Sequence, residues 1–136
     1  MSDVVVDASI WVSRLVEGDI HHARCQAWFQ TQTSDGGLLV SPVVMLAEVA
    51  GAISRRTGQR TLAHRAVGVL QELPSLRLVS VDAPLAGLAA QLAADHALRG
   101  ADAVYAATAA QLGLPLVTLD GEQLHRAQSI VSTFSP

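Results

Sequence analysis

A short apolar run near the N-terminus, Val4 to Val6, constrains the fold more than any other stretch of the chain. Three consecutive β-branched residues are typical of a strand buried on both faces, and such strands lie inside parallel sheets. The run ends at Asp7, and Ser9 follows two residues later. Because ligands of open α/β sheets bind at the carboxyl ends of such strands, Asp7 is a candidate site residue. The alternative is that Asp7 and Ser9 only form a turn and cap the next helix.

Helix-like and strand-like segments alternate along the rest of the sequence. Further strands are predicted to begin at Leu38, Leu76 and Leu116, with an edge strand at 130–131. Seven helices are predicted over 9–16, 21–32, 41–57, 62–73, 82–97, 99–112 and 122–127. Ser9 is expected to cap the first of them, and Ser41 the third, with Pro42 in its first turn. Asp82 is expected to cap the fifth helix, and Gly58 and Gly113 to end the third and the sixth. This order predicts one three-layer α/β domain over residues 1–136, with a central, mainly parallel sheet of four or five strands.

The cysteine and hydropathy patterns indicate the compartment. Half of the 136 residues are apolar, which is enough to bury a core without disulfides. The single cysteine, Cys25, excludes an internal disulfide and favours a reducing environment. The N-terminus has no basic region, and no apolar run is long enough to span a bilayer. We therefore expect a soluble cytoplasmic protein with no membrane partner.

The charge composition limits the chemistry. All nine basic residues are Arg, so mechanisms that need a catalytic lysine are excluded, including Schiff-base enzymes and Walker-type phosphate loops. The formal net charge of −3 argues at first against a nucleic-acid partner. If four of the acids lie in a metal site, the remaining surface carries a net charge of +1. An anionic substrate is then compatible with the composition.

Three further acids lie in unusual surroundings. Glu48 stands in an apolar helical segment, where its neighbours three and four positions away include Val44, Met45 and Gly51. A solvated Glu at the edge of an apolar face is the alternative explanation. Asp102 falls in the first turn of a helix whose next residues are small and apolar. The helix dipole alone would also favour a carboxylate there.

Asp120 repeats the pattern of Asp7, because it ends the apolar run that begins at Leu114. If Asp7 and Asp120 end adjacent parallel strands, they meet at one edge of the sheet, where Thr118 can orient a carboxylate or a water. Carboxylates gathered there repel one another by roughly 4 kcal/mol per pair at 4 Å, so such a cluster takes up protons or binds a cation. Ligands that are all oxygen favour Mg²⁺ or Mn²⁺, a setting suited to phosphodiester hydrolysis.

Arg55, Arg56 and Arg60 follow the helix that carries Glu48. They are candidate contacts to an RNA backbone. Compensation of the helix dipole by cations near its C-terminus is the other interpretation.

The four acids and their local sequences resemble those of PIN-domain ribonucleases, and in length and spacing the VapC-type toxins of toxin–antitoxin pairs. The resemblance spans nearly the whole chain: Val-Val-Asp7-Ala-Ser9, Glu48 after Ser41-Pro42, Asp102 in Arg-Gly-Ala-Asp-Ala-Val-Tyr-Ala-Ala, and Asp120 in Leu-Val-Thr-Leu-Asp. It implies that Asp7 and Asp102 bind Mg²⁺ or Mn²⁺, that Glu48 and Asp120 complete the catalytic site directly or through water, and that Ser9 and Thr118 support it.

The same resemblance implies a function and partners. It predicts an endoribonuclease that inhibits translation as the toxin of a type II toxin–antitoxin system. It also predicts a homodimer and an antitoxin whose C-terminal segment blocks the cleft.

Two other functions compete with this prediction. One is a non-catalytic binding module whose acidic pocket captures an Arg of a partner. The other is a haloacid-dehalogenase-type phosphatase, which should carry a second Asp two residues after Asp7. Ser9 stands at that position, and the chain has no Lys.

Overall fold

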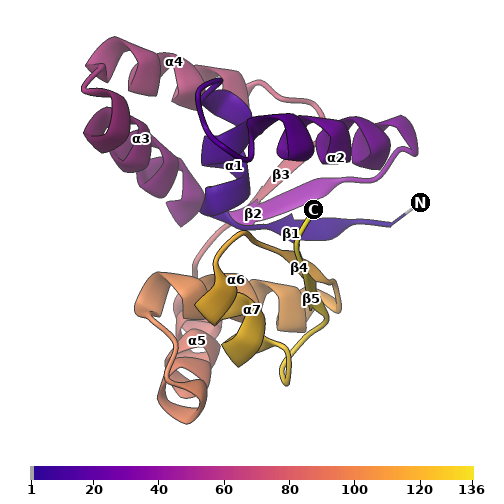
Figure 1. Ribbon diagram of the computed structural model, residues 1–136. Helices are drawn as coiled ribbons and strands as arrows, with labels where there is room; N and C mark the ends of the chain where they lie inside the picture. Colours follow the sequence, from indigo (N-terminus) through magenta and orange to yellow (C-terminus); the bar gives the residue numbers. More distant parts are fainter. Residues whose placement is uncertain (1) are drawn as a thin grey trace.

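The computed structural model describes residues 2–136, and its strands form one parallel sheet in the order β3-β2-β1-β4-β5 (Figure 1). β1 (Val4–Val6) is the middle strand, and all its residues are buried, as the β-branched run predicts. The other strands are β2 (Leu39–Pro42), β3 (Leu76–Val79), β4 (Leu116–Val117) and β5 (Thr133–Phe134). Every neighbouring pair is parallel.

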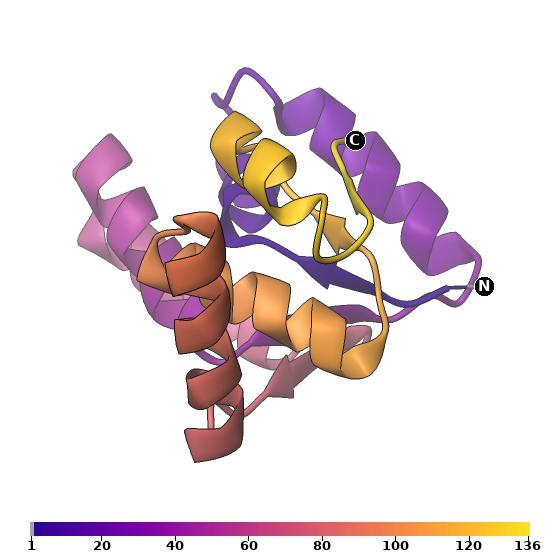
Figure 2. The ribbon, with the colours of Figure 1, turned by 90° about the horizontal axis from the view of Figure 1, so that it is seen from below.

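The helices cover both faces of this sheet. α1 to α4 lie on one face and α5 to α7 on the other, so the three-layer α/β prediction is confirmed (Figures 1 and 2). Their bounds are α1 Ala8–Leu15, α2 His22–Ser34, α3 Val44–Thr57, α4 Arg60–Gln71, α5 Ala83–His96, α6 Gly100–Leu112 and α7 Gly121–Ala127. α6 packs closely because alanines make its buried face, among them Ala103, Ala106 and Ala107.

The strand order places a topological switch beside β1. The chain runs from β1 through β2 to β3 in one direction, then crosses by α5 and α6 and returns to β4 on the other side of β1. Val6 is paired with Val117, so the residues that follow β1 and β4 emerge side by side. Open α/β sheets bind their ligands in the crevice at such a point.

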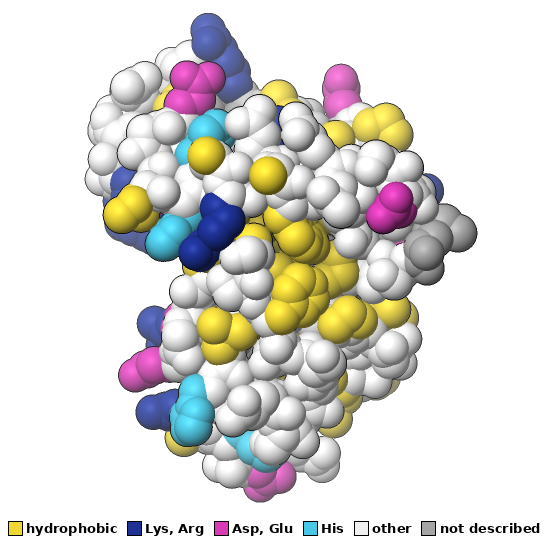
Figure 3. Space-filling view, turned by 45° about the vertical axis from the view of Figure 1, so that its right-hand side comes forward, with side chains coloured by type: hydrophobic (Ala, Val, Ile, Leu, Met, Phe, Trp, Pro, Cys, Tyr) yellow, Lys and Arg dark blue, Asp and Glu magenta, His cyan; other side chains and the backbone are white. Residues whose placement is uncertain are grey.

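The C-terminal strand is joined to the N-terminal half by aromatic packing. Trp28 of α2 lies 6.2 Å from Phe134 of β5, measured between ring centroids, and 5.0 Å from Phe29. Figure 3 shows hydrophobic side chains gathered between the upper and lower groups of helices on this side of the molecule. The last strand is therefore anchored by side chains as well as by its pairing with β4.

The predicted start of the third helix is wrong. Ser41 and Pro42 belong to β2, and α3 begins at Val44 without a side-chain cap. The Ser41 hydroxyl is buried, donates to the carbonyl of Val6 at 2.6 Å and accepts from Trp11 Nε1 at 3.0 Å. The Ser41 side chain, which the local sequence predicts to cap a helix, therefore bonds to residues that are distant in the sequence.

Two other local predictions also change. Asp7, and not Ser9, caps α1, because its carboxylate accepts from the backbone N–H of Ser9. Residues 130–131 form a turn after α7, and the edge strand lies two to four residues later in β5. The predicted caps at Asp82, Gly58 and Gly113 are confirmed, and both glycines adopt the left-handed conformation that ends a helix.

The remaining predicted helix ends lie within two residues of the observed ones. Across residues 2–136, none of the helices combines the length and apolar character that a bilayer crossing requires.

Replacing Ser41 by Ala is expected to lower the free energy of unfolding by about 1–3 kcal/mol, because it leaves the indole N–H of Trp11 without its acceptor. Urea unfolding followed by tryptophan fluorescence measures the change. Ser80→Ala, at an exposed position after β3, is the matched control. Equal unfolding midpoints for the two variants would contradict the assignment.

Candidate active site

Asp7 lies directly after β1 and is both a helix cap and a candidate ligand. Its side chain is buried, and Oδ2 accepts three hydrogen bonds: from the Ser9 N–H at 3.1 Å, from Ser9 Oγ at 2.5 Å and from Thr118 Oγ1 at 3.1 Å. Within residues 2–136, Oδ1 makes none. One carboxylate oxygen is thus fixed in place, while the other stays available for a ligand.

Hydroxyl groups tie the ends of β1 and β4 together around Asp7. Ser9 Oγ accepts from the Leu119 N–H at 3.0 Å, and Thr118 Oγ1 accepts from the Asp120 N–H at 3.0 Å. Thr118 Oγ1 also lies 3.1 Å from the side-chain oxygen of Gln123, a fully buried residue of α7. Ser9 and Thr118 therefore both contact Asp7, through a network that also includes the backbone N–H of Asp120.

Glu48 reaches the same region from α3. Its Oε1 accepts a hydrogen bond of 2.7 Å from the hydroxyl of Tyr105, a fully buried residue of α6. The Glu48 side chain is only partly exposed, so it does not stand on a solvated helix face. The Tyr105 hydroxyl therefore fixes the position of the Glu48 side chain, although the two residues come from helices on opposite faces of the sheet.

Asp102 and Asp120 share one cation. The Arg99 guanidinium donates through Nε to Asp102 Oδ2 at 3.0 Å and through a terminal nitrogen to Asp120 Oδ2 at 2.5 Å. The other oxygen of Asp120 caps α7 by accepting from the backbone N–H groups of Glu122 and Gln123. Asp102 lies in the first turn of α6, where the helix dipole favours it.

The acids are close enough to act on one another electrostatically. Burial raises the pKa of Asp7, and the charge of Asp102 raises it further, against the hydrogen bonds of Ser9 and Thr118. Burial likewise raises the pKa of Glu48, to which the charges of Asp7 and Asp102 add. For Asp102, burial and the charge of Asp120 raise the pKa, while Arg99 lowers it. Negative charge in this cluster is therefore only partly compensated.

Comparison with known proteins identifies the fold family. A family model for the PIN domain matches residues 4–128. The chain belongs to the PIN domain family. No curated protein sequence matches this PIN domain, but solved structures do.

Three solved structures illustrate the likeness, and VapC toxins are among its structural neighbours. VapC20 of Mycobacterium tuberculosis, described as a sarcin-ricin loop cleaving toxin, has a TM-score of 0.78 and 21% identity over 90% of this chain and 93% of its own. FitAcB from Neisseria gonorrhoeae has a TM-score of 0.71 and 23% identity, covering 96% of each chain. PAE2754 from Pyrobaculum aerophilum has a TM-score of 0.67 and 25% identity over 97% of this chain and 92% of its own.

The donor groups of this PIN domain suit a hard divalent cation, although they are not closed around one position. The converging ligands are carboxylate oxygens, the type that Mg²⁺ and Mn²⁺ prefer. As the side chains stand, residues 2–136 contain no group of three or more His, Cys, Asp or Glu placed to hold a metal ion. Arg99 instead lies between Asp102 and Asp120. The residues fit the cation in charge and chemistry, and this guanidinium must move for them to close around it.

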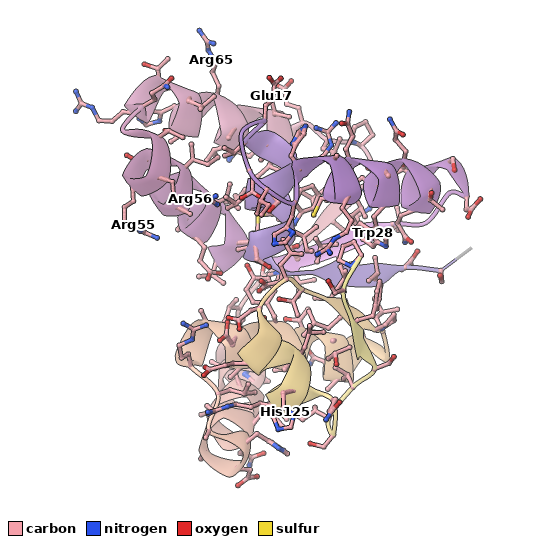
Figure 4. The ribbon with its side chains drawn as sticks, in the orientation of Figure 1. Glu17, Trp28, Arg55, Arg56, Arg65 and His125 are labelled. Carbon is pink, nitrogen blue, oxygen red and sulfur yellow. The ribbon has the colours of Figure 1, made fainter. Side chains whose placement is uncertain are left out.

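A cavity of about 590 Å³ opens beside the acids of the PIN domain. Ser9, Glu48 and Asp120 line it, and so do Arg55 and Arg56 from the C-terminal part of α3 (Figure 4). The two arginines differ, because Arg56 donates at 2.6 Å to Asp19, whose side chain is 5% exposed, whereas Arg55 folds back over Gly51.

The third predicted arginine is placed differently. Arg60 is exposed at the start of α4 and does not line the cavity. An RNA contact by any of the three arginines stays a prediction.

Three residues of the site, Arg99, Tyr105 and Gln123, were not assigned a role from the sequence. Arg99 and Tyr105 each lie three positions from Asp102 in the sequence, a spacing that places side chains on one helix face. That spacing is the one signal that points to them. Gln123 gives no such signal, since only the fold brings its amide nitrogen to the backbone carbonyl of Asp102, at 3.3 Å.

Asp7→Asn is expected to raise the melting temperature of the metal-free protein at neutral pH. The pKa of Asp7 in the folded chain is raised above its unfolded value of about 3.9, so stability falls as pH rises through this range. Asn keeps an acceptor oxygen for the cap. The gap between variant and wild type should close below about pH 3.5, where Asp7 is protonated in both states.

Calorimetric melts in EDTA, at neutral pH and below about pH 3.5, measure the difference in melting temperature between Asp7→Asn and wild type. The control is Asp35→Asn, in the exposed turn after α2. A lower melting temperature for Asp7→Asn at neutral pH would contradict the expectation.

Proposed function

We propose that this PIN domain is a metal-dependent endoribonuclease that hydrolyses RNA phosphodiester bonds, as the toxin of a type II toxin–antitoxin system that inhibits translation. One observation carries the proposal. Asp7, Glu48, Asp102 and Asp120 come from four different elements and converge at the carboxyl end of the sheet, where burial, with a smaller contribution from neighbouring acids, raises the pKa values of Asp7, Glu48 and Asp102. The like charges of such a cluster repel one another, so the charged cluster is unfavourable unless a cation binds to it.

The cation would be Mg²⁺ or Mn²⁺. Asp7 and Asp102 would hold it, with Glu48 and Asp120 contributing directly or through water. When bound, such an ion lowers the pKa of an attacking water and neutralises charge on the phosphate.

The protein's own contribution is to keep the ligands in place. Ser9 and Thr118 fix Oδ2 of Asp7 and leave Oδ1 available to a ligand. Tyr105 fixes Glu48 by its 2.7 Å hydrogen bond. Groups held in this way need little reorganisation during the reaction.

The cavity next to the acids suits a phosphate backbone. Arg55 lines it and has no carboxylate partner within residues 2–136, so its charge is available to an RNA phosphate. Arg56 lines the same cavity, but its pairing with Asp19 makes it the weaker candidate. Arg60 would contact RNA only beyond the cavity.

The structural neighbours support the biological setting of the proposal. VapC20 is described as cleaving the sarcin-ricin loop, and VapBC2 from Rickettsia felis and FitAB are described as bound to DNA. VapBC-5 from Mycobacterium tuberculosis is described as a member of the VapBC family of toxin–antitoxin systems. By this likeness we propose a cognate antitoxin, a homodimer and a cytoplasmic location.

Asp7→Asn is expected to lower the rate of RNA cleavage at least about 100-fold, because removing even an outer-shell partner of a metal ligand costs 10–100-fold. Cleavage of total RNA with Mg²⁺, with and without EDTA, measures it. Asp35→Asn is the matched control, since it makes the same chemical change at an exposed position. Full activity of Asp7→Asn, or activity that survives EDTA, would overturn the proposal.

A second candidate function is a non-catalytic module whose acidic pocket captures an Arg of a partner protein. The position of Arg99 favours it, because the Asp102–Asp120 pair already accepts a guanidinium. Calorimetry with millimolar Mn²⁺ and with an arginine-rich peptide separates the two functions. Peptide binding without Mn²⁺ binding would support the module, and Mn²⁺ binding that Asp7→Asn abolishes would support the nuclease.

A further inference from the structure

Arg99 is positioned to act as a cation inside the acid cluster. It is the N-cap residue of α6, three positions before Asp102, and its side chain caps nothing. It instead crosses to Asp120, 21 residues further along the chain, while keeping its bond to Asp102. Among residues 2–136, every ion pair made by one of the four acids is made with Arg99.

The bridge made by Arg99 is readily reversible. Its side chain is 70% exposed, against 15% for Asp102 and 27% for Asp120. Exposed ion pairs contribute little to stability, because water and salt screen them. The guanidinium can therefore turn into solvent while the two carboxylates stay anchored, Asp102 by its place in α6 and Asp120 by capping α7.

We propose that Arg99 competes with the divalent cation for Asp102 and Asp120, so that its side chain holds the site in a metal-free form and must be displaced before an ion binds. The inference rests on the metal site of the proposed function. It accounts for two features together: carboxylates that converge, and the lack of a closed metal-binding group within residues 2–136.

The competition sets the sign of the expected effect. If Arg99 merely held the two carboxylates in a geometry ready for metal, removing its charge would weaken metal binding. If it competes, removing its charge strengthens binding. Breaking two exposed ion pairs is worth roughly a 3- to 10-fold change in the dissociation constant.

Mn²⁺ titration by calorimetry on EDTA-stripped full-length protein tests the proposal. Arg99→Gln is expected to bind Mn²⁺ roughly 3- to 10-fold more tightly than wild type. Arg99→Lys, which keeps the charge without the planar fork, should lie between them. Circular dichroism melts without metal check that each variant folds.

Arg126→Gln is the matched control. Arg126 borders the same small cavity as Arg99 and Asp102, but it donates to the backbone carbonyl of Ala97 and to no carboxylate within residues 2–136. Its loss removes one positive charge from the same neighbourhood, so it measures the general electrostatic effect. Its dissociation constant should stay within about twofold of wild type.

A second measurement follows the Arg99 side chain directly. Addition of Mg²⁺ to the wild-type protein should shift the Arg99 Nε–H signal in ¹H–¹⁵N spectra, because that group leaves Asp102. Asp7→Asn should suppress this shift. An unmoved signal at a Mg²⁺ concentration that saturates the site would overturn the proposal.

The outcomes separate the two levels of inference. If wild type binds Mn²⁺ and Asp7→Asn abolishes binding, but Arg99→Gln binds no more tightly than Arg126→Gln, then competition by Arg99 is wrong and the metal site stands. If neither wild type nor Arg99→Gln binds millimolar Mn²⁺, both the metal site and the competition are wrong.

Discussion

The parallel pairing of β1 with β4 is the contact on which the candidate site depends. It aligns Val6 with Val117, so that Asp7 and Thr118 emerge together at the carboxyl edge of the sheet. The two strands are far apart in the sequence, and the chain must wind through both helical layers before they meet. Because Thr118, which donates to Asp7, directly follows β4, a shift of one residue in this register would turn Thr118 away from the carboxylate.

Burial of several carboxylates at one edge of the sheet is unfavourable, and the fold offsets this cost with hydrogen bonds and helix N-termini. Asp7 and Asp120 each cap a helix, Asp102 lies at a helix start, and Tyr105 donates to Glu48. Each device suits the charged form of an acid, yet burial still raises the pKa values of Asp7, Glu48 and Asp102. Charging these acids therefore costs free energy in the folded protein, and within residues 2–136 Arg99 is the cation that pairs with two acids of the cluster.

A helix cap and a functional carboxylate are often treated as competing explanations for a strand-end Asp. In this PIN domain the two explanations are compatible for Asp7 and Asp120, because only one oxygen of each carboxylate accepts the helix-cap hydrogen bonds. Asp7 uses Oδ2 for the cap and for the hydroxyls of Ser9 and Thr118. Asp120 uses Oδ1 for the cap of α7 and Oδ2 for Arg99. The cap then serves as the anchor that fixes the remaining oxygen.

The sequence by itself determined the features that depend on neighbours within about one helical turn or on strand composition. These include the buried β1, the alternation that makes a three-layer α/β fold, the cap at Asp82 and the glycines that end α3 and α6. It also singled out the four acids, since each stands in an unusual local setting.

Only the tertiary structure decided the contacts between distant residues. Ser41 joins β2 because Trp11 and Val6 offer it partners, Tyr105 meets Glu48 across 57 positions, and Arg99 reaches Asp120 across 21. Local propensity carries no information about such partners, because their energies arise only when packing removes water from both groups.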